Sequence, residues 1–291
     1  MARPGAILIG LSLLAFQPQD GLPDGVEGLK DIEFGKGGDV SLKLDLYRPA
    51  KRSGKLPGVV FIHGGGWQEG SRLPAFGMPE LAARGYVTVS IDYRLSTPTL
   101  PSFPAAVEDS KCAVRWFRAN ADKYGVDPNR IGVYGLSAGA HLALLVGCAR
   151  GMEGKGGFDG VSSKVQAVVS LSGPTNFMEK FPPATMAVVE RFIGGTRESR
   201  PQEFKQASPV THVTKDDPPV LLAQGDKDEL VPFEQAKLME KALKDVGVPV
   251  ELLLVKNADH VFGGKDAELN VAQVFDRSYK FLDAHLKPRK P

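Results

Sequence analysis

The chain of 291 residues is poor in cysteine and nearly balanced in charge, and each deficit excludes a class of protein. Its two cysteines are too few for a disulfide scaffold or a cysteine-rich zinc site. Lys and Arg number 36 against 34 Asp and Glu, so no basic excess attracts nucleic acid or an anionic membrane. Hydrophobic residues at 42% and charged residues at 24% are ordinary for a globular protein, which excludes disorder and coiled coil. Glycine, with 33 residues, is the abundant type.

A long apolar run is also missing. The run from Ala6 to Phe16 is shorter than the roughly 20 residues that span a bilayer, so we expect no stable membrane insertion. Its basic start and polar end are typical of a secretory signal peptide, although a buried N-terminal segment is the alternative. We therefore expect residues 1–19 to be a signal peptide, residues 20–291 to form one domain, and the protein to be secreted or periplasmic. Export would permit a bridge between Cys112 and Cys148, but both stand in apolar helical contexts, where free buried cysteine is common.

Strand-like and helix-like segments alternate from about residue 30 onward. Short apolar or alternating runs predict strands at residues 40–46, 57–62, 86–91, 130–134, 165–171, 219–223 and 250–255. Helical periodicity is present in residues 106–118, 138–148, 236–246 and 271–282. This alternation predicts an α/β fold with about eight mostly parallel strands and helices on both faces. Residues 173–217 lack a clear strand and are expected to form an insertion that acts as a lid or a substrate wall.

The first of these helices has two distinct faces. Its apolar face repeats from Ala106 to Phe117. The opposite face is polar and carries Glu108, Lys111, Arg115 and Arg118, so the segment is predicted to be a helix.

A nucleophile motif stands between a strand and a helix. Gly135-Leu-Ser-Ala-Gly139 follows the strand at 130–134 and opens the helix at 138–148. In a nucleophile elbow the turn is so tight that the residues two before and two after the serine must be small. The pattern predicts that the Ser137 hydroxyl is lifted above the sheet at the start of a helix, as a nucleophile requires.

Three successive glycines follow an earlier strand. His63-Gly-Gly-Gly-Trp67 comes directly after the strand at 57–62, and glycine lets the backbone turn its N–H groups toward an incoming oxygen. Such donors stabilise the oxyanion of ester hydrolysis, and the residue after the nucleophile, Ala138, is expected to add another. We expect His63 to organise this loop by hydrogen bonding, not to act as a base.

A serine nucleophile needs a general base, and the chain has five histidines. His141 is one helical turn after Ser137, His212 is in the insertion and His285 is on the last helix. His260 follows the last strand, at the edge of the sheet where Ser137 is expected.

The acid should follow the serine and precede the histidine in the chain. Asp226, Asp228 and Glu229 all follow the strand at 219–223 and all qualify by residue type. Asp226 is close enough to the strand to cap the loop, whereas Asp228 is farther out and could turn back toward His260. Asp259 is expected to be an exposed loop residue.

These segments together resemble the α/β-hydrolase carboxylesterases that carry an H-G-G-G-W oxyanion loop, similar to bacterial feruloyl and acetylxylan esterases and to hormone-sensitive-lipase-like esterases. The resemblance extends over residues 26–287. The segments that carry it are His63–Trp67, Asp92–Leu95, Phe103–Asp109, Gly135–Gly139 and the loops with Asp228 and His260.

The resemblance implies the α/β-hydrolase fold and a role for each matching residue. Ser137 is implied as nucleophile, His260 as base and Asp228 as acid. The implied oxyanion donors are the N–H groups of Gly65, Gly66 and Ala138.

Two further positions are compared with the family pattern. Asp109 matches an aspartate that looks structural and is expected to fix Arg94 or a nearby loop. Gln224 stands where many members carry histidine, at a position usually outside the triad.

The sequence therefore predicts a serine carboxylesterase that forms an acyl-enzyme and needs no metal or organic cofactor. Its expected partner is a small-molecule or polysaccharide ester with a short acyl chain or a carbohydrate-linked acetyl or feruloyl group, and Trp67 is a candidate substrate contact. An arylformamidase or other small-amide hydrolase would use the same residues. A binding module on a catalytically dead hydrolase fold is the alternative outside the enzymes. The oligomeric state is not predicted.

Overall fold

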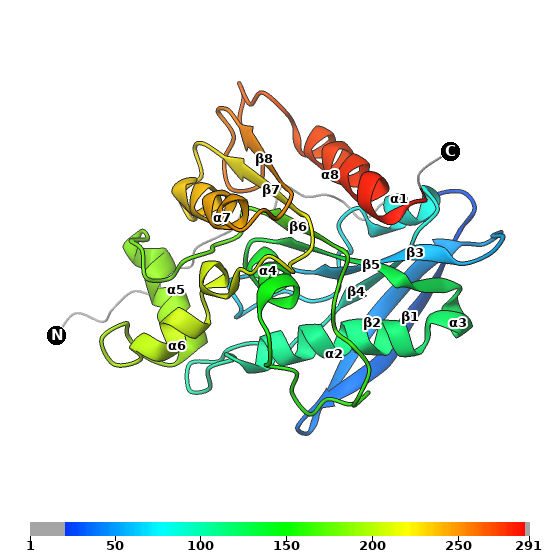
Figure 1. Ribbon diagram of the computed structural model, residues 1–291, viewed down its shortest axis with the longest axis horizontal. Coiled ribbons are helices and arrows are strands. Elements are labelled where there is room, and N and C mark those ends of the chain that lie inside the picture. The colour runs from blue at the N-terminus through cyan, green and yellow to red at the C-terminus, as the bar shows by residue number, and fades with distance from the viewer. Residues whose placement is uncertain (1–20, 289–291) are drawn as a thin grey trace.

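The apolar runs become the inner strands of one sheet in the computed structural model, which describes residues 21–288 (Figure 1). The strands are β1 (Val26–Gly37), β2 (Val40–Pro49), β3 (Leu56–Ile62), β4 (Val87–Ile91), β5 (Val126–Leu136), β6 (Ala167–Leu171), β7 (Val220–Gly225) and β8 (Val250–Val255). Their order across the sheet is β1-β2-β4-β3-β5-β6-β7-β8. The six strands from β4 to β8 in this order run parallel, while β2 pairs antiparallel with both β1 and β4. The predicted eight-stranded, mostly parallel α/β-hydrolase fold is confirmed.

Helices cover both faces of this sheet. They are α1 (Met78–Ala83), α2 (Ala105–Ala119), α3 (Ala121–Tyr124), α4 (Ala138–Cys148), α5 (Pro183–Ile193), α6 (Pro201–Gln206), α7 (Glu234–Asp245) and α8 (Val271–Leu286), with one 3-10 turn, η1 (Pro209–His212). Figure 1 shows α1 and α8 on one side of the sheet and α2, α4 and α7 on the other.

Two hydrophobic clusters hold the layers together. Within β3, Val60 and Ile62 belong to the cluster under α2, α4 and α7, whereas Val59 and Phe61 belong to the cluster under α1 and α8. Successive side chains of a strand point to opposite faces, so an unbroken apolar run fits a strand that is buried on both sides. The ends of these strands are thereby fixed, and the loops that follow them are held close together.

Two elements differ from the sequence-based expectation. The pattern did not predict β1, whose pairing with β2 shifts register twice, between Leu29 and Ile32 and between Glu33 and Gly35. These irregularities interrupt the two-residue alternation that identifies a half-buried strand. It also did not predict α1, which has only six residues and is too short for helical periodicity.

Two residues on the polar face of α2 are buried. Lys111 is only 1% exposed and Arg115 only 3%, because the segment between α4 and β6 folds over this side of the helix. The Lys111 amino group donates to the Ala149 oxygen at 2.7 Å and to the Gly151 oxygen at 2.5 Å. Arg115 donates to Glu153 at 2.9 Å. Both charges are therefore buried with partners, although they lie on the polar face of the helix.

The predicted insertion leaves the sheet after β6 and returns at β7. Residues 173–217 form α5, α6 and η1, and no strand is found among them. Cys112 and Cys148 are both buried and free, so the permitted bridge is not formed. The predicted signal peptide, residues 1–19, lies outside the described residues.

Candidate active site

Ser137 occupies the tight turn between β5 and α4. Its backbone angles, φ 55° and ψ −121°, lie in a region that L-residues rarely adopt, and they turn its side chain out of the path of the strand. A Cβ atom on Gly139 would overlap the Ile62 carbonyl oxygen, and one on Gly135 would overlap the Gly139 oxygen. The turn can therefore be this tight only with glycine at both positions.

Three side chains from separate loops form one hydrogen-bonded line. Ser137 Oγ lies 2.8 Å from His260 Nε2, and His260 Nδ1 lies 2.7 Å from Asp228 Oδ2. Because an ionised carboxylate only accepts, Nδ1 carries the proton and donates it to Asp228. Nε2 is then free to accept the serine hydroxyl proton. His260 is 8% exposed and the Asp228 side chain is completely buried.

The loop after β7 separates the candidate acids. Asp226 Oδ1 accepts the Asn257 N–H at 2.7 Å, so this carboxylate joins the loops after β7 and β8. Asp228 turns back into the site, and Glu229 is exposed. Asp259, next to the histidine, is exposed as expected and accepts backbone N–H groups of its own loop.

The glycine loop lies directly against the serine turn. A Cβ atom on Gly64 would be 3.3 Å from Ser137 Cβ, so the two loops are in contact. Gly65 and Gly66 have φ values of 107° and 58°, which side chains disfavour. No hydrogen bond found within residues 21–288 uses the N–H of Gly65 or Gly66 as donor. The Ala138 N–H stands at the first position of α4, where helix geometry supplies no acceptor.

His63 is buried below this loop and is not one of the three hydrogen-bonded side chains described above. Its Nδ1 donates to the Gly64 oxygen at 2.7 Å, and its ring stacks on Tyr93 with centroids 4.3 Å apart. Burial lowers the pKa of His63, so the neutral ring is favoured. This geometry agrees with the expected organising role.

Trp67 is not an open substrate wall. It is 3% exposed, stacks on Phe192 with centroids 4.5 Å apart, and meets Phe177 and His141 edge-on. Its ring therefore packs the glycine loop onto α4 and the insertion. The assignment of Trp67 to substrate contact is corrected accordingly, because its ring is enclosed by aromatic neighbours.

Helix α5 of the insertion contacts both the glycine loop and the loop that carries the acid. Val188 is the nearest side chain to the position that a Cβ on Gly66 would take, at 2.9 Å. Arg191 donates to Gln68, beyond the glycine loop, and Thr185 donates to the Leu230 oxygen of the acid loop at 2.9 Å. With Phe192 fully buried beneath it, α5 forms an anchored wall beside the oxyanion loop.

Two residues near the triad were not predicted as part of it. Ser172, at the end of β6, donates to the backbone oxygen of His260 at 2.8 Å. Gln224, at the end of β7, donates to Asp228 Oδ2 at 2.7 Å. No sequence motif includes Ser172. The only sequence feature that could have identified Gln224 was its position directly before the Gly-x-x-Asp segment. Asp109 forms hydrogen bonds with Arg94, as expected.

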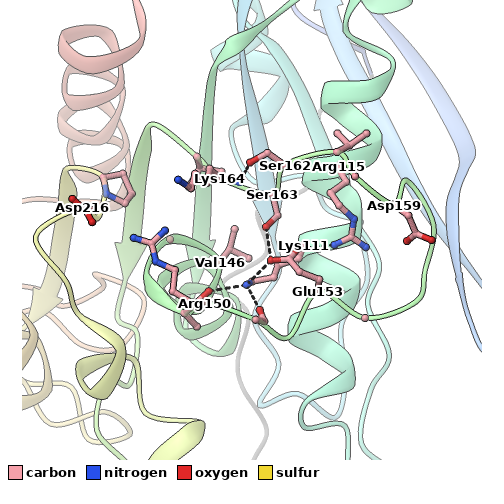
Figure 2. A pocket seen from close by; sticks show the side chains of 18 residues that line it. Lys111, Arg115, Val146, Arg150, Glu153, Asp159, Ser162, Ser163, Lys164 and Asp216 are labelled. Carbon is pink, nitrogen blue, oxygen red and sulfur yellow. Dashed lines mark hydrogen bonds and ion pairs between the residues drawn. The ribbon is translucent and has the colours of Figure 1, made fainter.

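A separate cavity lies at the other end of the strands. Its volume is about 330 Å³, and none of the triad residues lines it. Figure 2 shows Lys111, Arg115, Arg150 and Glu153 around it, at the C-terminal end of α4, whereas Ser137 stands at the N-terminal end.

Within residues 21–288 no helix is long and apolar enough to cross a membrane. No group of three or more His, Cys, Asp or Glu in that range could hold a metal ion.

Comparisons with known proteins point to esterases. The BD-FAE family model matches residues 44–243. Esterase LipC of Mycobacterium tuberculosis is 34% identical over 236 residues, which cover 78% of this chain and 58% of LipC. The chain spans a little over half the length of the first curated relatives that it matches.

Solved structures agree in fold over nearly the whole chain. Esterase 2 of Thermogutta terrifontis with butyrate bound has a TM-score of 0.75 and 30% identity, covering 92% of this chain and 97% of that one. The same esterase has been solved after phosphonylation by sarin. A truncated carbohydrate esterase from gut microbiota has a TM-score of 0.75 and 26% identity, covering 89% and 95%.

Proposed function

The chain belongs to the BD-FAE family, and we propose that it is a serine carboxylesterase with Ser137 as nucleophile, His260 as base and Asp228 as acid. The observation that carries this proposal is the unbroken hydrogen-bonded line from Asp228 through His260 to Ser137, with separations of 2.7 and 2.8 Å. Nucleophilic catalysis requires a base within this reach and a third group that orients it.

In the first half-reaction, Ser137 Oγ attacks the ester carbonyl carbon while His260 Nε2 takes the hydroxyl proton. The carbonyl electron pair moves to oxygen, which accepts the N–H groups of Gly65, Gly66 and Ala138. Each such donor is worth about 3 kcal/mol in the transition state by precedent. The carbon–oxygen bond to the alcohol then breaks, and His260 returns the proton to the leaving alcohol oxygen.

In the second half-reaction, water attacks the acyl-enzyme and gives its proton to His260. The tetrahedral intermediate uses the same N–H donors and collapses to the free acid, and His260 returns the proton to Ser137. Asp228 keeps the imidazole in one tautomer throughout and stabilises its charged form.

A short acyl chain or a carbohydrate-linked acetyl or feruloyl group is the substrate class that we propose. Support comes from the butyrate bound in one structural relative and from the carbohydrate esterase among the others. A panel of p-nitrophenyl esters from acetate to octanoate, with acetylated xylan and methyl ferulate, tests this class. N-formylkynurenine in the same panel tests the formamidase alternative. If it is hydrolysed faster than every ester, the formamidase alternative is favoured.

The decisive experiment replaces the nucleophile. Ser137→Ala should reduce kcat/KM for p-nitrophenyl acetate by at least about a thousandfold. It should also abolish covalent labelling by a fluorophosphonate, while thermal unfolding stays cooperative. Ser110→Ala, which changes a buried serine of α2, is the matched control and should keep both activities. Retained hydrolysis in Ser137→Ala overturns the assignment. A wild-type chain that neither hydrolyses the ester nor reacts with the fluorophosphonate favours the binding-module alternative.

Secretion or periplasmic export remains part of the proposal, supported by the sequence of residues 1–19. Expression of the full chain in a Gram-negative bacterium, followed by fractionation and N-terminal sequencing, tests it. We expect a shortened chain outside the cytoplasm, and an unprocessed chain in the cytoplasm would contradict export.

A further inference from the structure

The carboxylate of Asp228 is buried among four donors. Its Oδ1 accepts the N–H groups of Leu230 and Val231, each at 2.9 Å. Its Oδ2 accepts His260 Nδ1–H and Gln224 Nε2–H, each at 2.7 Å. A carboxylate offers about four acceptor sites, so this one is fully used. Water has no access to replace a lost donor, because the side chain is completely buried.

Gln224 is fixed in a single orientation by its neighbours. It is 1% exposed, and its Nε2 donates both to Asp228 and to the Val231 carbonyl oxygen, at 2.7 and 3.0 Å. Turning the amide over would place Oε1 against two acceptors. In the observed orientation Oε1 is a buried acceptor without a hydrogen-bond partner in the described part of the chain. A buried acceptor without a hydrogen bond lowers the stability of the fold, so this orientation of the amide benefits Asp228 and not the fold.

We propose that Gln224 is a positioning residue that holds Asp228 Oδ2 toward His260 Nδ1 and thereby keeps the imidazole oriented toward Ser137. The inference rests on the proposed esterase, in which Asp228 is the acid. Two donors on one oxygen divide its negative charge between them. Without the amide, Oδ2 would interact with the imidazole alone, and rotation of the carboxylate would be less restricted.

The test removes the donor and keeps the volume. Gln224→Met should lower kcat for p-nitrophenyl acetate about tenfold with little change in KM, because only the positioning of the base is impaired. The Nδ1–H proton signal of His260, followed at one pH by NMR of ¹⁵N-labelled histidine in the resting enzyme, should move downfield, because Asp228 Oδ2 then accepts from the imidazole alone.

A matched control separates this effect from a loss of stability. Gln235 is another glutamine that is 1% exposed, and its amide oxygen accepts the Thr175 and Asn176 N–H groups. Gln235→Met should lower Tm and leave the His260 Nδ1–H signal unchanged. Gln224→His, which supplies a ring N–H donor, should regain most of kcat.

The outcomes are distinguishable from a failure of the esterase assignment. If the wild-type protein hydrolyses esters but Gln224→Met keeps the wild-type kcat and the wild-type His260 Nδ1–H signal, the positioning role is overturned. It is also overturned if Gln224→His folds and is as slow as Gln224→Met. Should Gln224→Met not fold, Gln224→Asn takes its place, since its amide is one methylene too short to reach Asp228. The His260 Nδ1–H signal is measured without substrate, so it decides the question even if the protein has another activity.

Discussion

At the scale of single residues, the direction in which a carboxylate points decides its role. Asp226 and Asp228 stand two positions apart in the same loop, yet one accepts the Asn257 N–H and the other accepts from the His260 ring. Backbone N–H groups of Leu230 and Val231 hold Asp228 in its inward orientation. The acid is therefore defined by the turn that follows it.

This difference gives a prediction for the two aspartates. Asp228→Asn should reduce kcat by about 10³–10⁴, because an amide no longer stabilises the imidazolium or enforces its tautomer. Steady-state kinetics with p-nitrophenyl acetate at the pH optimum checks the change. Asp226→Asn, the same substitution two residues away, should keep nearly the full kcat. A larger loss in Asp226→Asn than in Asp228→Asn would reverse the assignment.

The sequence was sufficient to select the nucleophile and the base of the proposed site. Ser137 directly follows β5 and His260 lies in the loop after β8, and parallel strands bring such positions to one edge. The choice of acid needed the family resemblance, because residue type left three carboxylates open. Gln224 could not be predicted, since its role depends on an amide orientation that no sequence pattern encodes.

At the scale of elements, the inner strands and long helices were predictable and the irregular edge was not. Runs such as Val59–Ile62 are apolar throughout because both of their faces are covered. β1 has one exposed side and two register shifts, so its residues carry no regular pattern. The burial of Lys111 and Arg115 on the polar face of α2 could not be predicted, because the distant loop of residues 149–164 that covers them leaves no trace within the helix itself.

That buried face gives a second prediction. Lys111→Met should lower the free energy of unfolding by about 2–4 kcal/mol, because the Ala149 and Gly151 oxygens lose a charged donor. Urea unfolding measures the change. The esterase kcat/KM of the folded variant should equal that of wild type, because Lys111 lies at the far end of the strands.

The control for this variant is Lys164→Met, which replaces an exposed lysine that lines the same cavity. Its stability should differ little from wild type. Equal stability of Lys111→Met and Lys164→Met would show that the buried amino group contributes nothing to the fold.

At the scale of the whole molecule, the helix that begins at the nucleophile also joins the sheet to the insertion. His141, on α4, is completely buried, and its Nε2 donates to the Ala207 oxygen at 2.7 Å. Burial lowers the pKa of His141 to about 3, with a smaller lowering from His212. The folded protein therefore keeps this ring neutral at a pH at which the unfolded chain protonates it.

The consequence for stability has a definite sign. Between pH 6.5 and 3 the unfolded state binds one proton more than the folded state at this position, so stability decreases as the pH falls. The expected slope is about 1 kcal/mol per pH unit for one such group. Urea unfolding of wild type and of His141→Gln between pH 7 and pH 5 should show a shallower slope in the variant.

His212→Gln, which replaces a more exposed histidine of η1, controls for the loss of an imidazole and should keep the wild-type slope. Identical slopes in wild type and His141→Gln would mean that His141 does not titrate differently in the two states.

The order of the strands determines when the site can exist during folding. The glycine loop, Ser137, Asp228 and His260 follow β3, β5, β7 and β8, which lie in separate parts of the sheet and are joined by long connections. Pairing of distant segments is slow, and no short stretch of the chain contains the reacting groups. Covalent labelling of Ser137 in a refolding experiment would therefore count only those molecules in which the last parallel strand has docked. Under the proposed function, the fraction of Ser137 that is labelled at a given time therefore reports the fraction of molecules whose sheet is complete.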